Sequence, residues 1–204
     1  MLIDLSELST PQAYFTMTQT VIPRPIAWVL TQNKNDSYNL APFSYFNAVC
    51  SDPPMVAFSV GLQDDGSEKD TLRNIKQNGE MVIHIASCSQ LPDLNLSSAT
   101  LPPEVSEVDA GELSLSAVDG YNLPRLSDSK VAFMAATHQI IELGNNHQAL
   151  ILAEVSSIFV DDECVTTLEN GRQKILADKI EPLGRLGASE YVSFGDILSM
   201  KRPA

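Results

Sequence analysis

The sequence predicts a mainly β protein with some α-helix, folded as a closed or partly closed antiparallel β-barrel. Three observations predict this class: about six apolar, β-prone stretches, turn residues that join neighbouring stretches into hairpins, and few segments with helical periodicity. Strands with an apolar face and no covering helices must curl on themselves to remove their edges. A doubly wound α/β fold is the poor alternative, because neither a GxGxxG nor a GxxxxGKS loop occurs in the chain.

The first predicted strands come before any predicted helix. Residues 23–31, PRPIAWVLT, run apolar after prolines that hold the chain extended. The cluster NKNDS is typical of a turn, and residues 38–50 form a second strand-like stretch, in which Pro42 indicates a bulge or a sheet edge. We expect these two stretches to form a hairpin. The run MVAFSVG, residues 55–61, then predicts a short buried strand.

A short helix is predicted in KDTLRNIKQNGE. Leu72 and Ile75 have helical spacing, Asp70 is a candidate N-cap, and Gly79 is placed as the C-terminal stop. The following run MVIHIAS predicts another strand.

The second half of the chain predicts an excursion, a hairpin and a tail. Residues 87–126 mix small, polar and proline residues, which favours an excursion with one or two helical turns. Residues 130–144 and 147–160 flank the turn GNNH and predict the strongest hairpin. From 163–204 we expect a tail with a helical segment near Lys174 to Lys179.

Length and charge limit the classes of function. The 204 residues suggest one domain, residues 1–204, whose burial a second copy could complete. The formal net charge of −13 opposes binding to nucleic acid or to anionic membranes. The acidic N-terminus is unlike a signal peptide, and no apolar run approaches the roughly 20 residues that span a bilayer. We therefore expect a cytoplasmic protein, with three cysteines that indicate neither a disulfide framework nor a zinc site.

One candidate binding segment is KDT at the start of the predicted helix. Lys69, Thr71 and the free backbone amides of a helix start together suit a phosphate group. The alternative is an ordinary solvated helix start in which Asp70 is the cap, and this alternative is favoured when the segment is considered alone.

A second candidate lies in the first predicted hairpin. Ser44 and Asn47 interrupt its apolar pattern, and Asn47 offers a donor and an acceptor that match an imide or pyrimidine edge. Ala27 and Ala48 leave room for a flat ring. Alternatively, the two polar residues face solvent on a half-buried strand. Arg24, between two prolines, is either a fixed cation or a surface arginine.

The three histidines have different settings. His84 and His138 lie inside β-prone runs, so we expect them to be packed or paired in the sheet. His147 follows the GNNH turn, where it could orient a substrate or donate a proton near neutral pH, or could be merely exposed.

Five motifs follow one another along the chain: PRPIAWVLTQ, LAPFSYFNAVCSDPPMVAFSVG, KDTLRNI, GNNHQALILAEV and PLGRLGASEY. In this order they resemble the flavin reductase-like family of FMN-binding split-barrel proteins, which includes flavoredoxin. The resemblance implies an antiparallel split barrel, a homodimer, and FMN held near the subunit interface to pass reducing equivalents. It also implies that Arg185 and Tyr191 belong to a C-terminal segment that caps the cofactor or the partner subunit. The alternative for both residues is simple docking of the tail on the domain.

The resemblance implies roles for individual residues. It assigns the walls around the flavin ring and ribityl chain to Arg24, Pro25, Ile26, Ala27, Ser44, Tyr45, Phe46, Asn47 and Ala48, with Ser51 near the ring. It assigns the phosphate end to Lys69, Asp70 and Thr71. Arg24 or Arg185 would supply a cation at the ring edge, and His147 would be the catalytic residue that positions NAD(P)H.

Two functions follow from the resemblance. The first is a homodimeric FMN oxidoreductase that takes hydride from NAD(P)H at flavin N5 and reduces a small-molecule or protein acceptor. The second is a flavoredoxin-like electron carrier without productive NAD(P)H binding. The turn sequence slightly favours this carrier, because many flavin reductases have GDH at the position where this chain has GNNH. A split barrel that has lost its cofactor and acts as a binding module is the third possibility.

Overall fold

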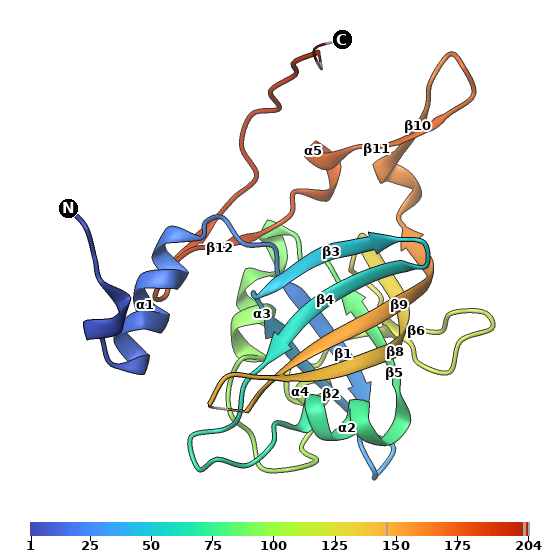
Figure 1. Ribbon diagram of the computed structural model, residues 1–204. Coiled ribbons are helices and arrows are strands. Elements are labelled where there is room, and N and C mark those ends of the chain that lie inside the picture. Colours follow the sequence, from blue (N-terminus) through green and yellow to red (C-terminus); the bar gives the residue numbers. More distant parts are fainter. Residues whose placement is uncertain (146, 202, 204) are drawn as a thin grey trace.

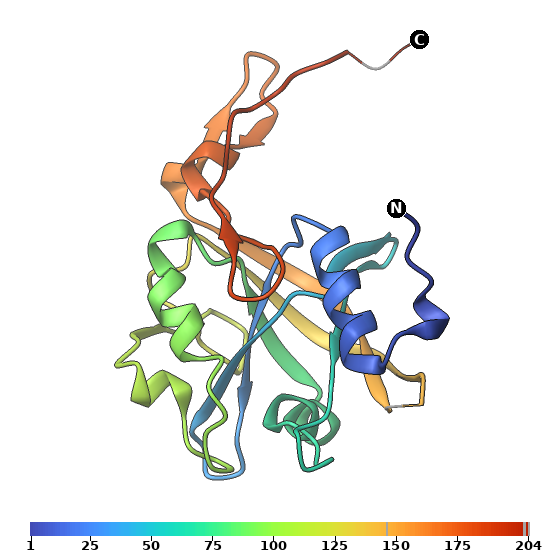
Figure 2. The ribbon, with the colours of Figure 1, turned by 90° about the vertical axis from the view of Figure 1, so that its left-hand side faces the viewer.

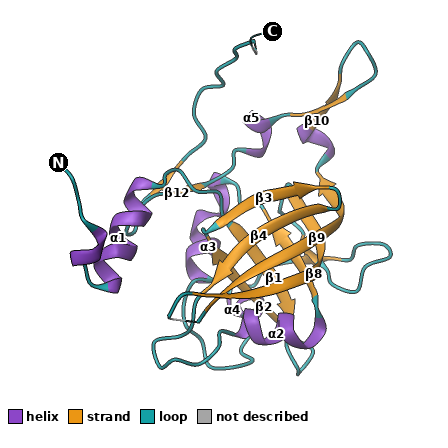
Figure 3. Cartoon of the chain, in the orientation of Figure 1, coloured by secondary structure: helices purple, strands orange, loops and turns teal. Residues whose placement is uncertain are grey.

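Seven strands form one antiparallel sheet in the computed structural model, which describes residues 1–145, 147–201 and 203. The order across the sheet is β2-β1-β5-β8-β9-β4-β3. The strands are β1 (Ala27–Gln32), β2 (Tyr38–Phe43), β3 (Phe46–Ser51), β4 (Pro54–Val60), β5 (Glu80–His84), β8 (Val131–Leu143) and β9 (Gln148–Val160). Figure 1 shows that the sheet is strongly curved, and Figure 3 shows strands at the centre with helices around them. The mainly β, antiparallel class is confirmed.

The two edge strands of the sheet, β2 and β3, follow each other directly in the chain. Only Ser44 and Tyr45 separate them, and no ladder joins them among the described residues, so hydrogen bonds do not close the sheet into a barrel. The single stretch predicted over 38–50 is therefore two strands at opposite edges. Pro42 lies on β2, where a missing backbone donor costs no ladder bond because the outer side of an edge strand is unpaired.

Both predicted hairpins are present. β1 pairs with β2 across the NKNDS turn, although the strand begins at Ala27 and not at Pro23. β8 and β9 pair along 13 residues each and carry irregularities in register at two places. Asn146 in the turn between them lies outside the described residues.

The predicted helix is α2 (Asp70–Asn78), which ends at Gly79 in the left-handed conformation with φ 75°. Its N-cap is Lys69, so the prediction that Asp70 caps the helix is wrong. The carboxylate of Asp70 is held elsewhere, because it pairs with Arg73 and accepts a hydrogen bond from the backbone N–H of Glu104 at 3.3 Å.

The inner, concave side of the sheet holds one hydrophobic core. Leu72 and Ile75 of α2 pack into it and close one end. Its fully buried members from the strands include Val29, Phe58, Val60, Ile83 and Ile151.

A second core lies on the outer side of the sheet, under the segment that joins β5 to β8. This segment contains the 3-10 helix η2 (Cys88–Gln90), α3 (Leu91–Leu96), α4 (Glu107–Ala110), β6 (Leu115–Ser116) and β7 (Arg125–Leu126). Leu94 and Val108 pack there against Trp28, whose indole N–H donates to Ser97 Oγ at 2.8 Å. The predicted excursion therefore covers the outer face, so the premise that no helices cover the strands is wrong.

The first helix, α1 (Thr10–Thr20), follows the 3-10 helix η1 (Leu5–Glu7) and was not predicted. Its sequence lacks an apolar stripe, and only Thr18 is buried. The available signal was at its start, where Ser9 and Gln12 form a capping box and Pro11 occupies the first turn.

The C-terminal part forms an arm and a tail that project from the sheet (Figures 1 and 2). The arm contains η3 (Asp162–Cys164), β10 (Val165–Thr167), β11 (Gln173–Ile175) and α5 (Ala177–Ile180). The chain then returns to the body through β12 (Gly184–Arg185) and β13 (Tyr191–Val192). No helix among the described residues is long and apolar enough to cross a membrane.

Candidate functional site

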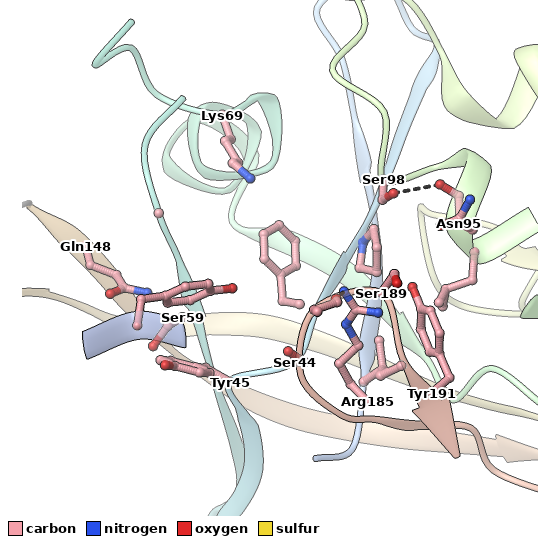
Figure 4. Close-up of a pocket in the computed structure, with 17 residues that line it drawn as sticks. Ser44, Tyr45, Ser59, Lys69, Asn95, Ser98, Gln148, Arg185, Ser189 and Tyr191 are labelled. Carbon is pink, nitrogen blue, oxygen red and sulfur yellow. Dashed lines mark hydrogen bonds between the residues drawn. The ribbon is translucent and has the colours of Figure 1, made fainter. Parts of the chain in front are cut away.

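A cavity of about 470 Å³ lies where α1, the β2–β3 link, the start of α2, α3 and the β12–β13 loop meet. We call it the basic cavity. Its floor and walls include Ile26, Phe43, Ser44, Tyr45, Ser59 and Leu94. Figure 4 shows Arg185 and Tyr191 on one side, Tyr45 and Gln148 on the other, and Lys69 entering from the start of α2. Its volume falls within the range of small-molecule sites, roughly 300 to 1,000 Å³.

The charge of this cavity differs from that of the whole chain. Lys69 and Arg185 line it, and no Asp or Glu among the described residues does, although the chain has a formal net charge of −13. A concave site lined by positive charge concentrates anionic ligands. The cavity therefore suits a ligand that carries a negative group.

Arg185 is the last residue of β12, and the loop that follows holds its side chain. Its guanidinium donates to the backbone carbonyls of Ala188 and Glu190 and lies 4.3 Å from the centre of the Tyr191 ring. Ala188 has a φ of 49°, so the loop turns sharply at this point. These contacts hold the charged group beside the cavity and leave part of it free to meet a ligand.

Two tyrosines form the opposite wall. The rings of Tyr14 from α1 and Tyr45 from the β2–β3 link are 6.2 Å apart between centroids and tilted by 37°. Burial, with a smaller contribution from Tyr14, raises the pKa of Tyr45, so its phenol stays protonated at neutral pH and can donate a hydrogen bond. Flat aromatic faces of this kind pack well against a planar ring.

A second cavity of about 520 Å³ adjoins the first and shares Pro42, Phe43, Lys69 and Ser98 with it. We call it the acidic cavity, because Asp64, Asp65, Asp70 and Glu107 line it. Burial raises the pKa of Glu107, whose carboxylate accepts the Leu40 N–H at 2.9 Å. The excess of carboxylates makes this second cavity unfavourable for an anion.

Arg24 lies behind the basic cavity and does not line it. Only 5% of its surface is exposed. Its guanidinium donates to the carbonyls of Thr18, Val21 and Leu186 and to Ser44 Oγ. These protein groups take up most of its donors, and the role of Arg24 as a cation at a ring edge stays a prediction that the contacts within one chain do not support.

Comparison with known proteins identifies the family. The family described as "Flavin reductase like domain" matches residues 17–176. The chain belongs to the flavin reductase-like family. It is 33% identical over 202 residues to the protein YwrF of Bacillus subtilis, with 97% of each chain covered.

Two solved structures of this family's fold are similar over nearly the whole chain. Nitrilotriacetate monooxygenase component B from Bacillus cereus is 29% identical with a TM-score of 0.89, covering 98% of each chain. The 2-nitrobenzoate 2-nitroreductase NbaA of Pseudomonas fluorescens is 26% identical with a TM-score of 0.88, covering 100% of this chain and 96% of its own.

The structure brings five of the predicted flavin-binding residues together in the basic cavity. They are Ile26, Ser44, Tyr45, Lys69 and Arg185. Asp70 and Thr71 lie next to it in the acidic cavity. Thr71 is buried, and its Oγ1 accepts a hydrogen bond from Asn39 at 2.9 Å. The phosphate segment is thus divided, with Lys69 alone reaching both cavities.

The other predicted flavin contacts lie outside both cavities. Ala27 is fully buried in the inner core and Pro25 is exposed. The remaining four, Phe46, Asn47, Ala48 and Ser51, are on β3 at the far edge of the sheet. Asn47 is exposed, as its alternative interpretation held, and its side chain accepts from the N–H of Ala48 at 3.0 Å. The flavin-binding role of these residues stays a prediction.

The predicted catalytic histidine also lies outside the cavity. His147 has a φ of 49°, its side chain is 66% exposed, and its Nδ1 contacts Glu142. The next residue, Gln148, begins β9 and does line the basic cavity. The role of His147 toward NAD(P)H therefore stays a prediction that the contacts within one chain do not support.

The other two histidines are paired, as expected. His84 Nδ1 contacts the carbonyl of Trp28 at 3.0 Å, and its Nε2 accepts the N–H of Leu126 at 3.0 Å. Its burial lowers the pKa to about 4, so the ring is neutral at neutral pH. His138 stands at an irregularity of β8, with its Nδ1 3.5 Å from a carboxylate oxygen of Glu154.

Sequence reasoning missed several residues of the cavity. Tyr14 lies on the unpredicted helix, and Asn95 and Ser98 lie on or near α3 in the excursion. Ser59 and Gln148 sit on strands whose existence was predicted, but nothing in the sequence set them apart from other polar strand residues.

Proposed function

We propose that the protein binds FMN in the basic cavity and works as a flavin-dependent oxidoreductase. When bound, FMN would accept hydride from NAD(P)H at N5 and pass the electrons to a small-molecule or protein acceptor. The observation that carries the proposal is the lining of the cavity, with two cations, aromatic side chains and no carboxylate among the described residues. FMN combines a planar ring with an anionic phosphate and fits this donor set.

Lys69 is the side chain best placed to hold the phosphate. It is the N-cap of α2, a helix of nine residues, so its ammonium and the positive end of the helix dipole act in the same place. The carboxylates of the acidic cavity, on the other side of Lys69, favour a phosphate that stays on the basic side. A bidentate arginine is not needed for this contact, because a lysine binds phosphate as a point charge.

The other cavity residues would orient the ring and exclude water. Tyr45 and Phe43 offer flat apolar surface, and Ser44, Ser59 and Gln148 offer hydrogen bonds to polar ring atoms. Arg185 supplies positive charge, which stabilises the more electron-rich state of a ligand in the same cavity.

We also propose that two copies form a dimer and that β2 and β3 border the opening of a split barrel. Large apolar side chains are exposed on and after α1, namely Phe15, Met17, Val21 and Ile22, and Val49 is exposed on β3. Large apolar side chains that remain exposed in one chain are a feature of surfaces that a second chain covers. A cytoplasmic location stays a prediction from the sequence.

The electron-carrier function remains the second candidate, and one observation favours it. His147 lies on the surface beside Glu142 and does not line the basic cavity, so no residue of the GNNH turn described in the structure is placed to position NAD(P)H. A carrier of this type would bind FMN and exchange electrons with a protein partner.

Anaerobic absorbance spectroscopy of the FMN-loaded protein separates the two functions. Loss of the flavin bands on addition of NADH or NADPH is the result expected of the reductase. Bands that persist until dithionite is added would favour the carrier. The acceptor can then be sought among free flavin, ferric chelates and nitroaromatic compounds, the last because one similar structure is named a nitroreductase.

A further inference from the structure

Three segments that form walls of the basic cavity meet at a single buried side chain, that of Arg24. Helix α1 contributes Tyr14 to the cavity, the β2–β3 link contributes Ser44 and Tyr45, and β12 with the loop after it contributes Arg185 and Ala188. The Arg24 guanidinium hydrogen-bonds to all three segments and lines none of the cavity itself.

The contacts of Arg24 fall at the ends of these segments. Two of its hydrogen bonds reach the carbonyls of Thr18 and Val21 at the C-terminal end of α1, where a cation also meets the negative end of the helix dipole. A third bond, of 2.7 Å, reaches the carbonyl of Leu186 in the β12–β13 loop. The fourth, of 3.3 Å, reaches Ser44 Oγ.

The main chain of Arg24 pairs with β12, the strand from which this loop begins. Its N–H donates to the Arg185 carbonyl at 3.0 Å, and the Arg185 N–H donates back to the Arg24 carbonyl at 2.8 Å. The position of Arg185 beside the cavity thus depends directly on Arg24.

Helix α1 has few other attachments to the rest of the protein. Thr18 is its one buried residue. Its end lies against the β12–β13 loop (Figures 1 and 2), and the approach is so close that a Cβ on Gly187 would lie 2.3 Å from Gln19 Cγ. An element with so little buried surface opens at low free-energy cost unless specific bonds hold it.

We propose that Arg24 is a positioning residue that holds α1 and the β12–β13 loop closed over the basic cavity and so sets the rate at which bound flavin leaves. This inference rests on the proposed binding of FMN in that cavity. Charge-assisted hydrogen bonds to buried or partly buried carbonyls are strong, and removing the guanidinium would leave these carbonyls without their shared partner. The two walls then separate more often, which raises the dissociation rate constant and leaves the association rate constant nearly unchanged.

The test measures FMN dissociation and association rates by stopped-flow fluorescence in the wild-type protein and in Arg24→Ala and Arg24→Lys. We expect dissociation to be about tenfold to hundredfold faster in Arg24→Ala, as for the loss of charge-assisted bonds. Association should change less than about threefold. Arg24→Lys keeps the charge but not the fork of donors, so its dissociation rate constant should lie between those of the wild type and Arg24→Ala. Added methylguanidine should slow dissociation from Arg24→Ala and not from the wild type.

A second pair of variants tests the same junction without touching Arg24. Gly187→Ala places a methyl group against Gln19 and should speed flavin dissociation, whereas Gly195→Ala, a glycine with nothing within 4 Å of its added Cβ, is the matched control. If FMN dissociated at the wild-type rate from both Arg24→Ala and Gly187→Ala, the inference would be overturned. It would also be overturned if the association rate constant of Arg24→Ala fell by the same factor as its dissociation rate constant rose and methylguanidine did not slow dissociation. If the wild-type protein bound no FMN, the proposed function would fail, and that result differs from every outcome named for the variants.

Discussion

Replacing Lys69 with methionine removes one of the two positive charges that line the basic cavity and keeps much of the apolar length of the side chain. A hydrogen bond to a charged group is worth about 1.5 to 3 kcal/mol, and exposure reduces such a contribution. Lys69 is exposed and stands at the mouth shared by two cavities, so we expect a loss of about 1 to 2 kcal/mol in FMN binding. This corresponds to a roughly fivefold to thirtyfold increase in Kd.

Comparison of two flavins makes this prediction specific for the phosphate. FMN and riboflavin share the ring and the ribityl chain, and riboflavin lacks the phosphate. Titration of flavin fluorescence should show weaker FMN binding by Lys69→Met and unchanged riboflavin binding. The matched control is Lys76→Met, on the last turn of the same helix, where the ammonium pairs with Glu68 and lines neither cavity. Equal effects on both flavins, or no effect on FMN, would refute the assignment of Lys69 to the phosphate.

Three further predictions follow from the same contacts. Arg185→Met should lower the reduction potential of bound flavin by about 20 to 80 mV, because a nearby positive charge stabilises the reduced state, and a spectroelectrochemical titration would measure it. His84 is buried and its pKa is lowered to about 4, so the histidine of the unfolded chain takes up a proton at a higher pH than that of the folded chain. The free energy of unfolding should therefore fall as the pH drops from about 6.5 toward 4, by up to about 3 kcal/mol. Urea unfolding at several pH values should therefore show a shallower acid dependence in His84→Gln than in the wild type. Burial raises the pKa of Glu107, so Glu107→Gln should unfold at higher urea concentration than the wild type near pH 7. This difference should shrink as the pH falls through the raised pKa toward the ordinary pKa of glutamate, and it should be gone below that value.

Local patterns in the sequence were enough to predict most of the sheet. Apolar runs with turn residues between them located the β8–β9 hairpin and the β1–β2 hairpin, and Gly79 marked the end of α2 because a left-handed residue was needed there. Helix α1 was not predicted because its face is not apolar, and its end meets the guanidinium of Arg24, a contact that no local pattern indicates.

Only part of the site was predicted, because local motifs contain some of its residues and not others. Lys69 and Arg185 lie in motifs that the sequence singled out, whereas Tyr14 and Asn95 reach the cavity only because the chain returns to it from distant segments. Arg24 shows the limit most clearly. Its residue type suggested a cation for a ligand, whereas in the structure its guanidinium donates to the carbonyls of Thr18, Val21 and Leu186, which no local sequence pattern predicts.

The central claim is that the basic cavity binds FMN through Lys69 and the aromatic walls, and a crystal structure of the protein with FMN tests it most directly. We predict density for the ring between Tyr45 and the Arg185 side of the cavity, and density for the phosphate within hydrogen-bonding distance of Lys69 Nζ. Density for FMN in the acidic cavity, or at a surface remote from Lys69, would contradict the account.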